Sequence, residues 1–217
     1  MLNNWIEEAE KIIGYTFKNK SLLIRAFTHS SYSNEHKNFP DYERLEFLGD
    51  SALNFIMSVY LYNYFPNMTE GQLTKKRAGI VGEEALSQVI EDMNLARFLM
   101  VGAGDVNDKS RNSSAVKCDL FESITGAILL DNDMDIACAK KFILDKLSHL
   151  VNVDIIDYKS KLLEELARKN LKHSFEVVPA ENGFAATLYI EGKSVSQGSG
   201  STKKAAEKQA SKRYFKS

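Results

Sequence analysis

Apolar residues recur at every third or fourth position through most of residues 1–150, which is the spacing of an amphipathic α-helix. The longest such stretch covers residues 42–64, and Pro66 follows its predicted end. Its predicted inner face consists of Leu45, Leu48, Ala52, Phe55, Ile56 and Val59. Further helices are predicted within residues 6–13, 22–27, 73–93, 118–130 and 136–150, with a loop at 102–114. This part of the chain is therefore expected to form an all-α domain.

The hydrophobic period changes after a predicted linker at residues 151–156. The predicted elements are, in chain order, a helix at 158–169, strands at 175–178, 184–191 and 194–197, and a helix at 203–215. Asn-Gly and Gly-Lys pairs stand where hairpin turns are needed. Ser201 or Thr202 is expected to cap the last helix. Residues 157–217 should therefore form a small α+β domain of order α-β-β-β-α, with helices on one face of an antiparallel sheet.

The charges are divided unequally between the two predicted domains. Residues 157–217 contain twelve Lys and Arg against seven Asp and Glu, a net charge of +5, whereas residues 1–156 contain 16 against 22, a net charge of −6. A basic module that binds a nucleic acid, joined to an acidic domain that processes it, would fit this division. Charge alone also fits a solvated lysine-rich surface.

Several classes of protein are excluded by composition. The two cysteines, Cys118 and Cys138, are too few for a disulfide framework, so a reduced thiol pair is expected. The longest apolar run, at about 124–130, is too short to cross a bilayer. Early acids in the first 17 residues do not fit a signal peptide. We therefore expect a cytoplasmic protein without a membrane partner.

Carboxylates occupy spacings of three and four within two otherwise apolar helices. Glu43, Glu46 and Asp50 share one face of the first helix, and Asp119 and Glu122 share one face of the second. Like charges at this spacing repel, so the arrangement favours a site for a hard cation such as Mg²⁺. Such a site can promote hydrolysis of a phosphodiester. Either cluster also fits a solvated acidic face or a row of salt bridges, and spacing does not decide between these interpretations.

The same segments carry a resemblance to a known family. YERLEFLGDSALNF at 42–55 resembles the signature of the ribonuclease III family, and DLFESITGAILLD at 119–131 resembles its second acidic block. FTHSSY at 27–32 and EGQLTKKRA at 70–78 agree with that resemblance. The ending GSGSTKKAAEKQASKRYF is similar to the double-stranded RNA-binding domain that follows the nuclease domain in the short bacterial-type enzymes.

The resemblance implies roles for individual acids. Glu46, Asp50, Asp119 and Glu122 match the family's ligands for Mg²⁺, for which Mn²⁺ can substitute, and Asp50 and Glu122 match those most critical for hydrolysis. Two further acids, Glu43 and Glu70, match auxiliary positions of the same valley. The implied activity is hydrolysis of both strands of double-stranded RNA to 5′-phosphate and 3′-hydroxyl ends with short 3′ overhangs, in the processing of rRNA and other RNA.

The resemblance also implies a homodimer. Phe47 matches an aromatic residue that family members insert into a socket on the other subunit. One nuclease domain holds one cutting site, and cleavage of both strands needs two sites, which a two-fold homodimer supplies.

In the predicted α+β domain, Lys203, Lys204 and Lys208 are expected to bind RNA phosphates at the start of the last helix. Two departures from the family pattern are visible: the loop between the first two strands is reduced to PAENG, and Leu163 and Ala167 stand where glutamines are usual. Duplex RNA is recognised partly through minor-groove contacts, so we expect weaker binding than is typical.

His29 is interpreted as a helix-capping residue, not as a general base, because a metal site needs no imidazole to act on water. The main alternative for the whole chain is a catalytically silent protein on the same fold that binds double-stranded RNA or serves in assembly. Retention of all four predicted metal ligands favours the enzyme. An acidic scaffold without a nucleic-acid partner would leave the basic module unexplained.

Overall fold

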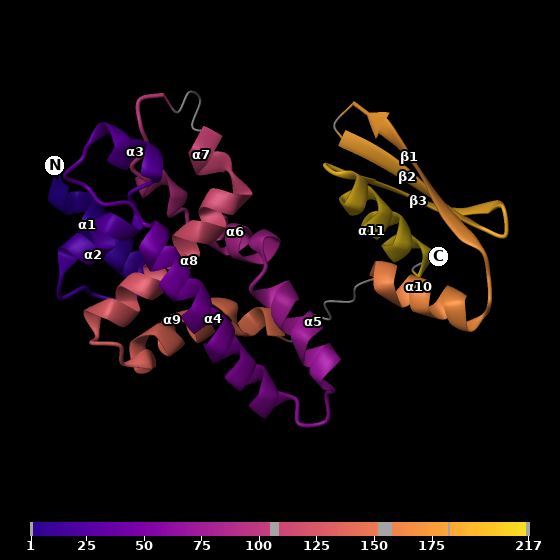
Figure 1. The fold of residues 1–217 in the computed structure, drawn as a ribbon, viewed down its shortest axis with the longest axis horizontal. Coiled ribbons are helices and arrows are strands. Elements are labelled where there is room, and N and C mark those ends of the chain that lie inside the picture. The colour runs from indigo at the N-terminus through magenta and orange to yellow at the C-terminus, as the bar shows by residue number, and fades with distance from the viewer. Residues whose placement is uncertain (1, 105–108, 152–157, 182, 216–217) are drawn as a thin grey trace. The chain divides into compact units, whose positions relative to one another are not determined.

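A computed structural model of the chain describes residues 2–104, 109–151, 158–181 and 183–215 (Figure 1). The chain divides into two compact units, Met1–Val153 and Asp154–Ser217. The described helices of the first unit are α1 (Leu2–Ile13), α2 (Lys20–Ala26), α3 (Ser30–Glu35), α4 (Glu43–Tyr64), α5 (Glu70–Ile80), α6 (Glu83–Asp92), a 3₁₀ turn η1 (Ala96–Phe98), α7 (Lys109–Asn112), α8 (Ser114–Asp131) and α9 (Ile136–Val151). Within the described ranges, no helix is both long and apolar enough to cross a membrane.

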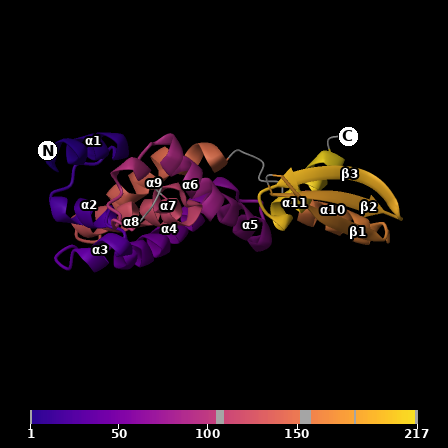
Figure 2. The same ribbon diagram turned by 90° about the horizontal axis from the view of Figure 1, so that it is seen from above.

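The centre of the first unit is the contact between α4 and α8, which lie side by side in Figures 1 and 2. The two backbones touch at two glycines. A Cβ atom on Gly49 would lie 1.8 Å from the carbonyl oxygen of Glu122, and a Cβ atom on Gly126 would lie 2.2 Å from that of Leu45. Any larger residue would force the helices apart, so glycine at both positions sets the distance between them.

Apolar side chains surround this crossing. α8 is buried over most of its length, because α2, α4, α6 and α9 all pack against it. Its fully buried residues include Leu120, Phe121, Ile124 and Ile128, and Phe121 stacks on Phe142 of α9 with ring centroids 5.1 Å apart. Burial of each such side chain stabilises the folded state by about 1.5–3 kcal/mol. Because α8 buries many of them against four other helices, it is the central helix of the unit.

The predicted inner face of α4 is partly wrong. Leu45, Ala52 and Ile56 are buried, but Phe55 is 60% exposed and Val59 is 41% exposed. The 3.6-residue period shows that α4 has apolar residues on two neighbouring stripes, but it does not show which stripe is buried. The stripe that includes Gly49 packs against α8, and the stripe with Phe55 and Val59 is exposed.

Two other expectations for the first unit need correction. The single helix predicted within 73–93 is two helices, because the chain turns at Gly82, where a Cβ atom would lie 2.5 Å from the carbonyl oxygen of Ala78. The loop predicted at 102–114 contains the short helix α7, and its residues 105–108 lie outside the described residues. The helix predicted at 42–64 does end before Pro66, as expected.

The second unit consists of α10 (Tyr158–Arg168), β1 (His173–Ala180), β2 (Gly183–Ile190), β3 (Lys193–Gly200) and α11 (Lys203–Tyr214). The sheet is antiparallel with order β1-β2-β3. Glu191 and Gly192 both have positive φ, 47° and 75°, and form the two-residue turn between β2 and β3. The predicted order α-β-β-β-α, and with it the predicted fold class, is confirmed. Of the predicted linker, residues 152–156 lie outside the described residues.

Helix α11 packs closely on β3 through small residues. A Cβ atom on Gly198 would lie 2.2 Å from the backbone nitrogen of Ala210, and Ala206 and Ala210 are fully buried. Thr202 caps the helix by accepting a hydrogen bond of 3.1 Å from the backbone of Ala205, which confirms the cap expected there. This packing fixes the start of α11 beside the end of the sheet.

The far end of α8 is anchored by the buried carboxylate of Asp131. It accepts hydrogen bonds from the hydroxyl of Tyr15 (2.7 Å) and from the backbone N–H groups of Lys18 (2.7 Å) and Asn19 (2.8 Å). Burial opposes ionisation, but these hydrogen bonds outweigh it and lower the pKa of Asp131 below 3.8, the ordinary value for aspartate.

Replacing Asp131 should therefore destabilise the first unit in a pH-dependent way. Asp131→Ala leaves three donors without their acceptor, and we expect a loss of about 3 kcal/mol near pH 7, measured by urea unfolding. Because the folded pKa is lowered, the contribution of Asp131 is present above its unfolded pKa and is lost as the pH falls through the folded pKa. The gap to wild type should therefore begin to narrow below about pH 4 and continue to narrow as the pH falls further. Asp145→Ala, which removes an exposed carboxylate on α9, serves as the control and should change stability by less than about 0.5 kcal/mol.

Candidate metal centre and nucleic-acid interface

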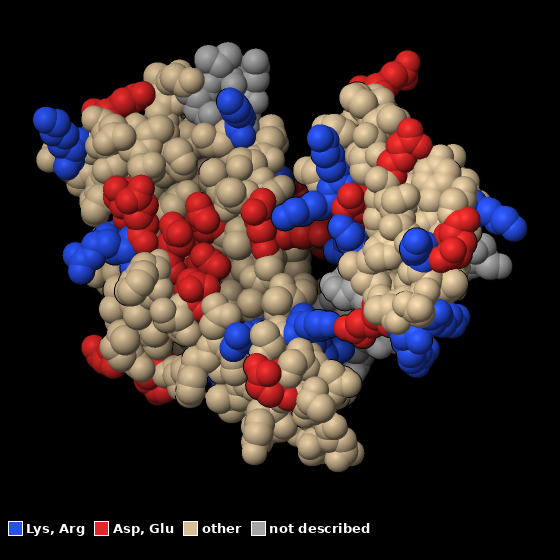
Figure 3. Space-filling model, turned by 45° about the vertical axis from the view of Figure 1, so that its right-hand side comes forward, with Lys and Arg blue, Asp and Glu red and all other residues tan. Residues whose placement is uncertain are grey.

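The crossing of α4 and α8 brings together carboxylates that are far apart in the sequence. Glu46 lies one turn before Gly49 on α4, and Glu122 lies one turn before Gly126 on α8. Glu46, Asp119 and Glu122 each offer a carboxylate oxygen within 4.8 Å of the other two, and all three side chains are half-buried. Acidic side chains gather on one face of the first unit in Figure 3.

Burial raises the pKa values of all three carboxylates of this triad, and neighbouring acids add to the effect. Burial first, and then the charge of Asp50, raises the pKa of Glu122 to about 7. Burial and the charge of Asp119 also raise the pKa of Glu46. Burial raises the pKa of Asp119, although a hydrogen bond from Tyr42 acts in the opposite direction.

A divalent cation fits this arrangement. Three ionised carboxylates at such distances repel one another, and a bound divalent cation would compensate their charge. Their donor atoms are all oxygens, which suits a hard cation such as Mg²⁺, and the half-buried position still leaves access from solvent.

The fourth predicted ligand, Asp50, lies beside the triad and is not one of its three members. Its side chain is exposed and accepts a hydrogen bond of 2.6 Å from the amide of Asn54, one turn further along α4. It lies one turn after Glu46 on α4, and its charge contributes to the raised pKa values of Glu122 and Glu46.

The auxiliary acids lie in different places. Glu43 is exposed at the start of α4, and its charge contributes to the raised pKa of Glu46. Glu70 begins α5, where it accepts a hydrogen bond of 3.0 Å from Thr74 and lines a separate hollow with Leu61 and Tyr62. Within the described residues, Glu70 does not belong to the triad of its own subunit.

Phe47 and His29 are also found in distinct settings. Phe47 lies between Glu46 and Asp50 in sequence and is 77% exposed, the most exposed large apolar side chain among the described residues. His29 caps α3: its Nδ1 accepts a hydrogen bond of 3.2 Å from the backbone of Ser31 and lies 2.8 Å from the Ser31 hydroxyl. The capping role expected for His29 is confirmed.

Sequence reasoning missed three residues that contact the acids. The buried hydroxyl of Tyr42 donates a hydrogen bond of 3.2 Å to Oδ2 of Asp119. Asn54 binds Asp50, and the Cys118 thiol lies 3.8 Å from Oε1 of Glu122. Burial raises the pKa of Cys118, which therefore stays a neutral thiol. Asn54 and Cys118 lie four residues from the acid that each contacts, and this helical spacing is a signal that could have identified them.

The second unit presents exposed lysines at the start of α11. Lys203, Lys204 and Lys208 are all exposed, and Nζ of Lys203 lies 5.8 Å from the ring centroid of Phe184. The start of a helix offers free backbone N–H groups and a positive dipole end to a phosphate.

The loop between the first two strands is short, as expected from the sequence. Ala180 pairs directly with Gly183, so only two residues join β1 to β2.

Each of the two units matches a known protein family, and the whole chain is similar to known proteins. Residues 19–150 match the family model described as ribonuclease-III-like, and residues 158–216 match the double-stranded RNA binding motif. Ribonuclease 3 of Listeria monocytogenes is 39% identical over 219 aligned positions, which cover 96% of this chain and 95% of that protein. Ribonuclease 3 of Enterococcus faecalis is 37% identical, with 100% of this chain and 99% of that protein covered.

The fold of the first unit is similar to solved structures of a nuclease domain. The nuclease domain of ribonuclease III from Campylobacter jejuni superposes with a TM-score of 0.61 at 33% identity, covering 72% of this chain and 100% of that domain. A second structure of that domain, with a TM-score of 0.59 at 32% identity, covers 66% of this chain and 99% of that domain. It is described as flexible in the region involved in dimer formation.

The helical unit with paired acidic blocks, followed by an α-β-β-β-α module, defines a nuclease joined to a double-stranded RNA-binding domain. The chain belongs to the ribonuclease III family. The predicted class of enzyme, an endoribonuclease that acts on double-stranded RNA, is thereby confirmed.

Proposed function

We propose that this protein is a Mg²⁺-dependent homodimeric endoribonuclease that hydrolyses both strands of double-stranded RNA to 5′-phosphate and 3′-hydroxyl ends. Processing of rRNA and other RNA in the cytoplasm is the proposed role. The observation that carries the proposal is the convergence of Glu46, Asp119 and Glu122, whose carboxylate oxygens lie within 4.8 Å of one another. Mn²⁺ is proposed to substitute for Mg²⁺, because it also prefers oxygen ligands.

Glu46, Asp50, Asp119 and Glu122 are the residues proposed to hold the cation. When bound, Mg²⁺ supplies a positive charge that polarises the phosphoryl oxygens and lowers the pKa of water. The two helices hold the carboxylates in place before substrate binds, so little reorganisation is needed. Asp50, which is exposed beside the triad, and Glu122, which is half-buried within it, are proposed as the acids most critical for hydrolysis.

Recognition of the duplex is proposed to lie in the second unit. Lys203, Lys204 and Lys208 are positioned by the close packing of α11 on β3 and bear positive charge where a phosphate would meet the helix start. Contacts of this kind recognise the shape of A-form RNA and carry little sequence information. The two-residue connection between β1 and β2 limits reach into a minor groove, which supports weaker binding by this unit.

The homodimer is supported by an apolar stripe along the outer side of α4. Phe47, Phe55, Val59 and Tyr62 follow one another at helical spacing and are between 41% and 77% exposed. Several large exposed side chains in one row are unusual on a monomer and mark a surface that another protein covers. A two-fold axis across this stripe would pair it with the same stripe on a second copy.

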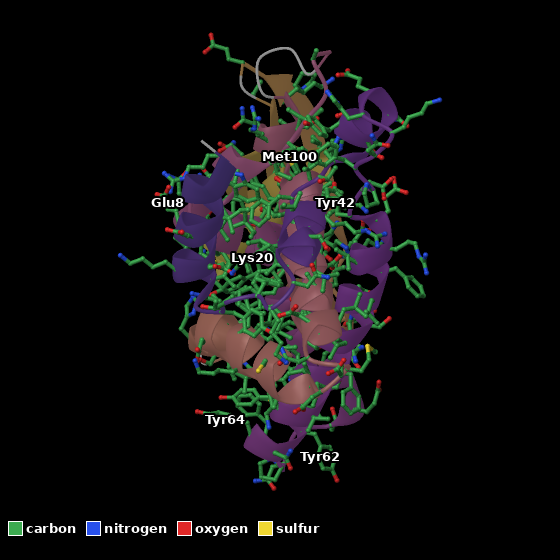
Figure 4. The ribbon with its side chains drawn as sticks, turned by 90° about the vertical axis from the view of Figure 1, so that its left-hand side faces the viewer. Glu8, Lys20, Tyr42, Tyr62, Tyr64 and Met100 are labelled. Atoms are coloured by element: carbon green, nitrogen blue, oxygen red, sulfur yellow. The ribbon has the colours of Figure 1, made fainter. Side chains whose placement is uncertain are left out.

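Such a pairing would also explain the position of Glu70. A two-fold axis perpendicular to α4 makes the two copies of that helix antiparallel, so the Tyr62 end of one lies near the Glu46 end of the other. Figure 4 shows Tyr42 and Tyr62 at opposite ends of α4. Glu70 lines the same hollow as Tyr62. Glu70 is therefore proposed to act as an auxiliary acid toward the partner subunit's metal centre, whereas Glu43 acts within its own subunit.

The proposed activity predicts separate effects on cleavage and binding. Wild type should cut a long RNA duplex into short duplexes in the presence of Mg²⁺. Glu122→Ala removes one of the three converging carboxylates and should lower the cleavage rate by more than about 100-fold while leaving duplex binding in a gel-shift assay within about twofold.

Asp145→Ala, with an exposed acid removed from α9, is the control and should cut like wild type. If wild type binds the duplex but leaves it intact with Mg²⁺ or Mn²⁺, the chain is a silent binding protein and the proposal is wrong. Loss of duplex binding in Glu122→Ala would instead mark that residue as structural.

The proposed dimer predicts a specific effect of truncating the apolar stripe. Phe47→Ala should weaken self-association by about 2 kcal/mol, roughly 30-fold in the dissociation constant, because a large aromatic side chain loses its contact with the second copy. Sedimentation equilibrium measures the change. Leu130→Ala, at another exposed apolar side chain, is the matched control and should associate like wild type. A wild-type chain that stays monomeric at high micromolar concentration would contradict the dimer.

A further inference from the structure

A buried tyrosine joins the two acidic segments of the metal centre. Tyr42 is only 3% exposed, and its hydroxyl donates a hydrogen bond of 3.2 Å to Oδ2 of Asp119, which is 77 residues away in the sequence. Tyr42 directly precedes Glu43, the first residue of α4, whereas Asp119 belongs to α8. This is the one hydrogen bond between side chains that connects the start of α4 to the acids of α8 in the described residues.

The backbone of Tyr42 is fixed as firmly as its ring. Its N–H donates to the carbonyl oxygen of Thr28 (3.0 Å), and its own carbonyl oxygen accepts from the N–H groups of Leu45 (2.7 Å) and Glu46 (2.9 Å). The ring packs edge-on against His29, with centroids 5.9 Å apart. A side chain held at both ends in this way has little freedom, so its hydroxyl occupies a defined position relative to Glu46.

The hydrogen bond has a consequence for the geometry of Asp119. A carboxylate on a helix can rotate about its side-chain bonds, and repulsion from Glu46 and Glu122 favours rotation away from them. A donor on Oδ2 opposes that rotation and leaves Oδ1 as the oxygen to meet a cation. Groups that hold metal ligands in this way typically change metal affinity by 10–100-fold when removed.

We propose that Tyr42 is a positioning residue that orients Asp119 for a divalent cation and so sets the affinity of the metal centre. The inference rests on the proposed metal-dependent function. It assigns to Tyr42 an effect on cation binding, not on the chemical step, because the hydroxyl contacts a ligand and not the substrate.

The test is the Tyr42→Phe variant, which keeps the buried ring and removes only the hydroxyl. Mn²⁺ binding to the full-length protein without RNA, measured by isothermal titration, should weaken about 10-fold. In duplex cleavage, the Mg²⁺ concentration for half-maximal rate should rise by a similar factor, whereas the rate at saturating Mg²⁺ should stay within about twofold of wild type.

The chain offers a matched control. Tyr15 also donates through its hydroxyl to an aspartate of α8, namely Asp131 at the opposite end of that helix (2.7 Å). Tyr15→Phe removes the same kind of hydrogen bond away from the acids and should bind Mn²⁺ like wild type. All titrations are made well below the melting midpoint of each variant, so that only folded protein is compared.

Each outcome decides the matter. Weaker Mn²⁺ binding in Tyr42→Phe alone supports the proposal. Unchanged binding in Tyr42→Phe, or equal weakening in both variants, overturns it, since the second result would reflect general destabilisation. If Tyr42→Phe does not fold, the hydroxyl is a structural group and the proposal is also overturned. A wild-type protein that neither binds Mn²⁺ nor cleaves RNA would contradict the proposed function itself, which separates the two failures.

Discussion

Helices α4 and α8 touch backbone against backbone, and this contact sets the geometry of the first unit. Gly49 and Gly126 have no Cβ atom, and any larger residue at either position would collide with the opposite helix. The acids one turn away on each helix are therefore brought within reach of one another. Glu46 comes from one helix and Glu122 from the other, so neither helix alone could form the triad. The glycines thus determine the site as well as the packing of the core.

This arrangement places an unfavourable cluster of charge on a well-packed core. Burial and the charges of neighbouring acids raise the pKa values of Glu46, Asp119 and Glu122, which is a cost in free energy for the folded state without a cation. The buried apolar residues of α8 and the anchored carboxylate of Asp131 offset that cost. Core residues and acids are therefore separated between faces of one helix: Leu120 and Phe121, which lie between Asp119 and Glu122 in the sequence, are fully buried, whereas the two acids are half-buried.

Much of the fold could be predicted from the sequence, because helical period and strand alternation are local properties. The break at Gly82 and the exposure of Phe55 could not, since each depends on which face of a helix meets a neighbour. Spacing and resemblance point to the acids of the candidate site, but spacing gives no indication that Asp50 lies outside the cluster of Glu46, Asp119 and Glu122. The bond from Tyr42 to Asp119 joins residues 77 positions apart, and no local pattern indicates it.

Whether acids of both helices hold one cation can be seen by anomalous diffraction from crystals of the protein soaked with Mn²⁺. We expect one strong anomalous peak per subunit, within coordination distance, about 2–2.3 Å, of carboxylate oxygens from Glu46 on α4 and from Asp119 and Glu122 on α8. A peak bound to acids of only one helix, or no peak at saturating Mn²⁺, would show that the two helices do not share a cation.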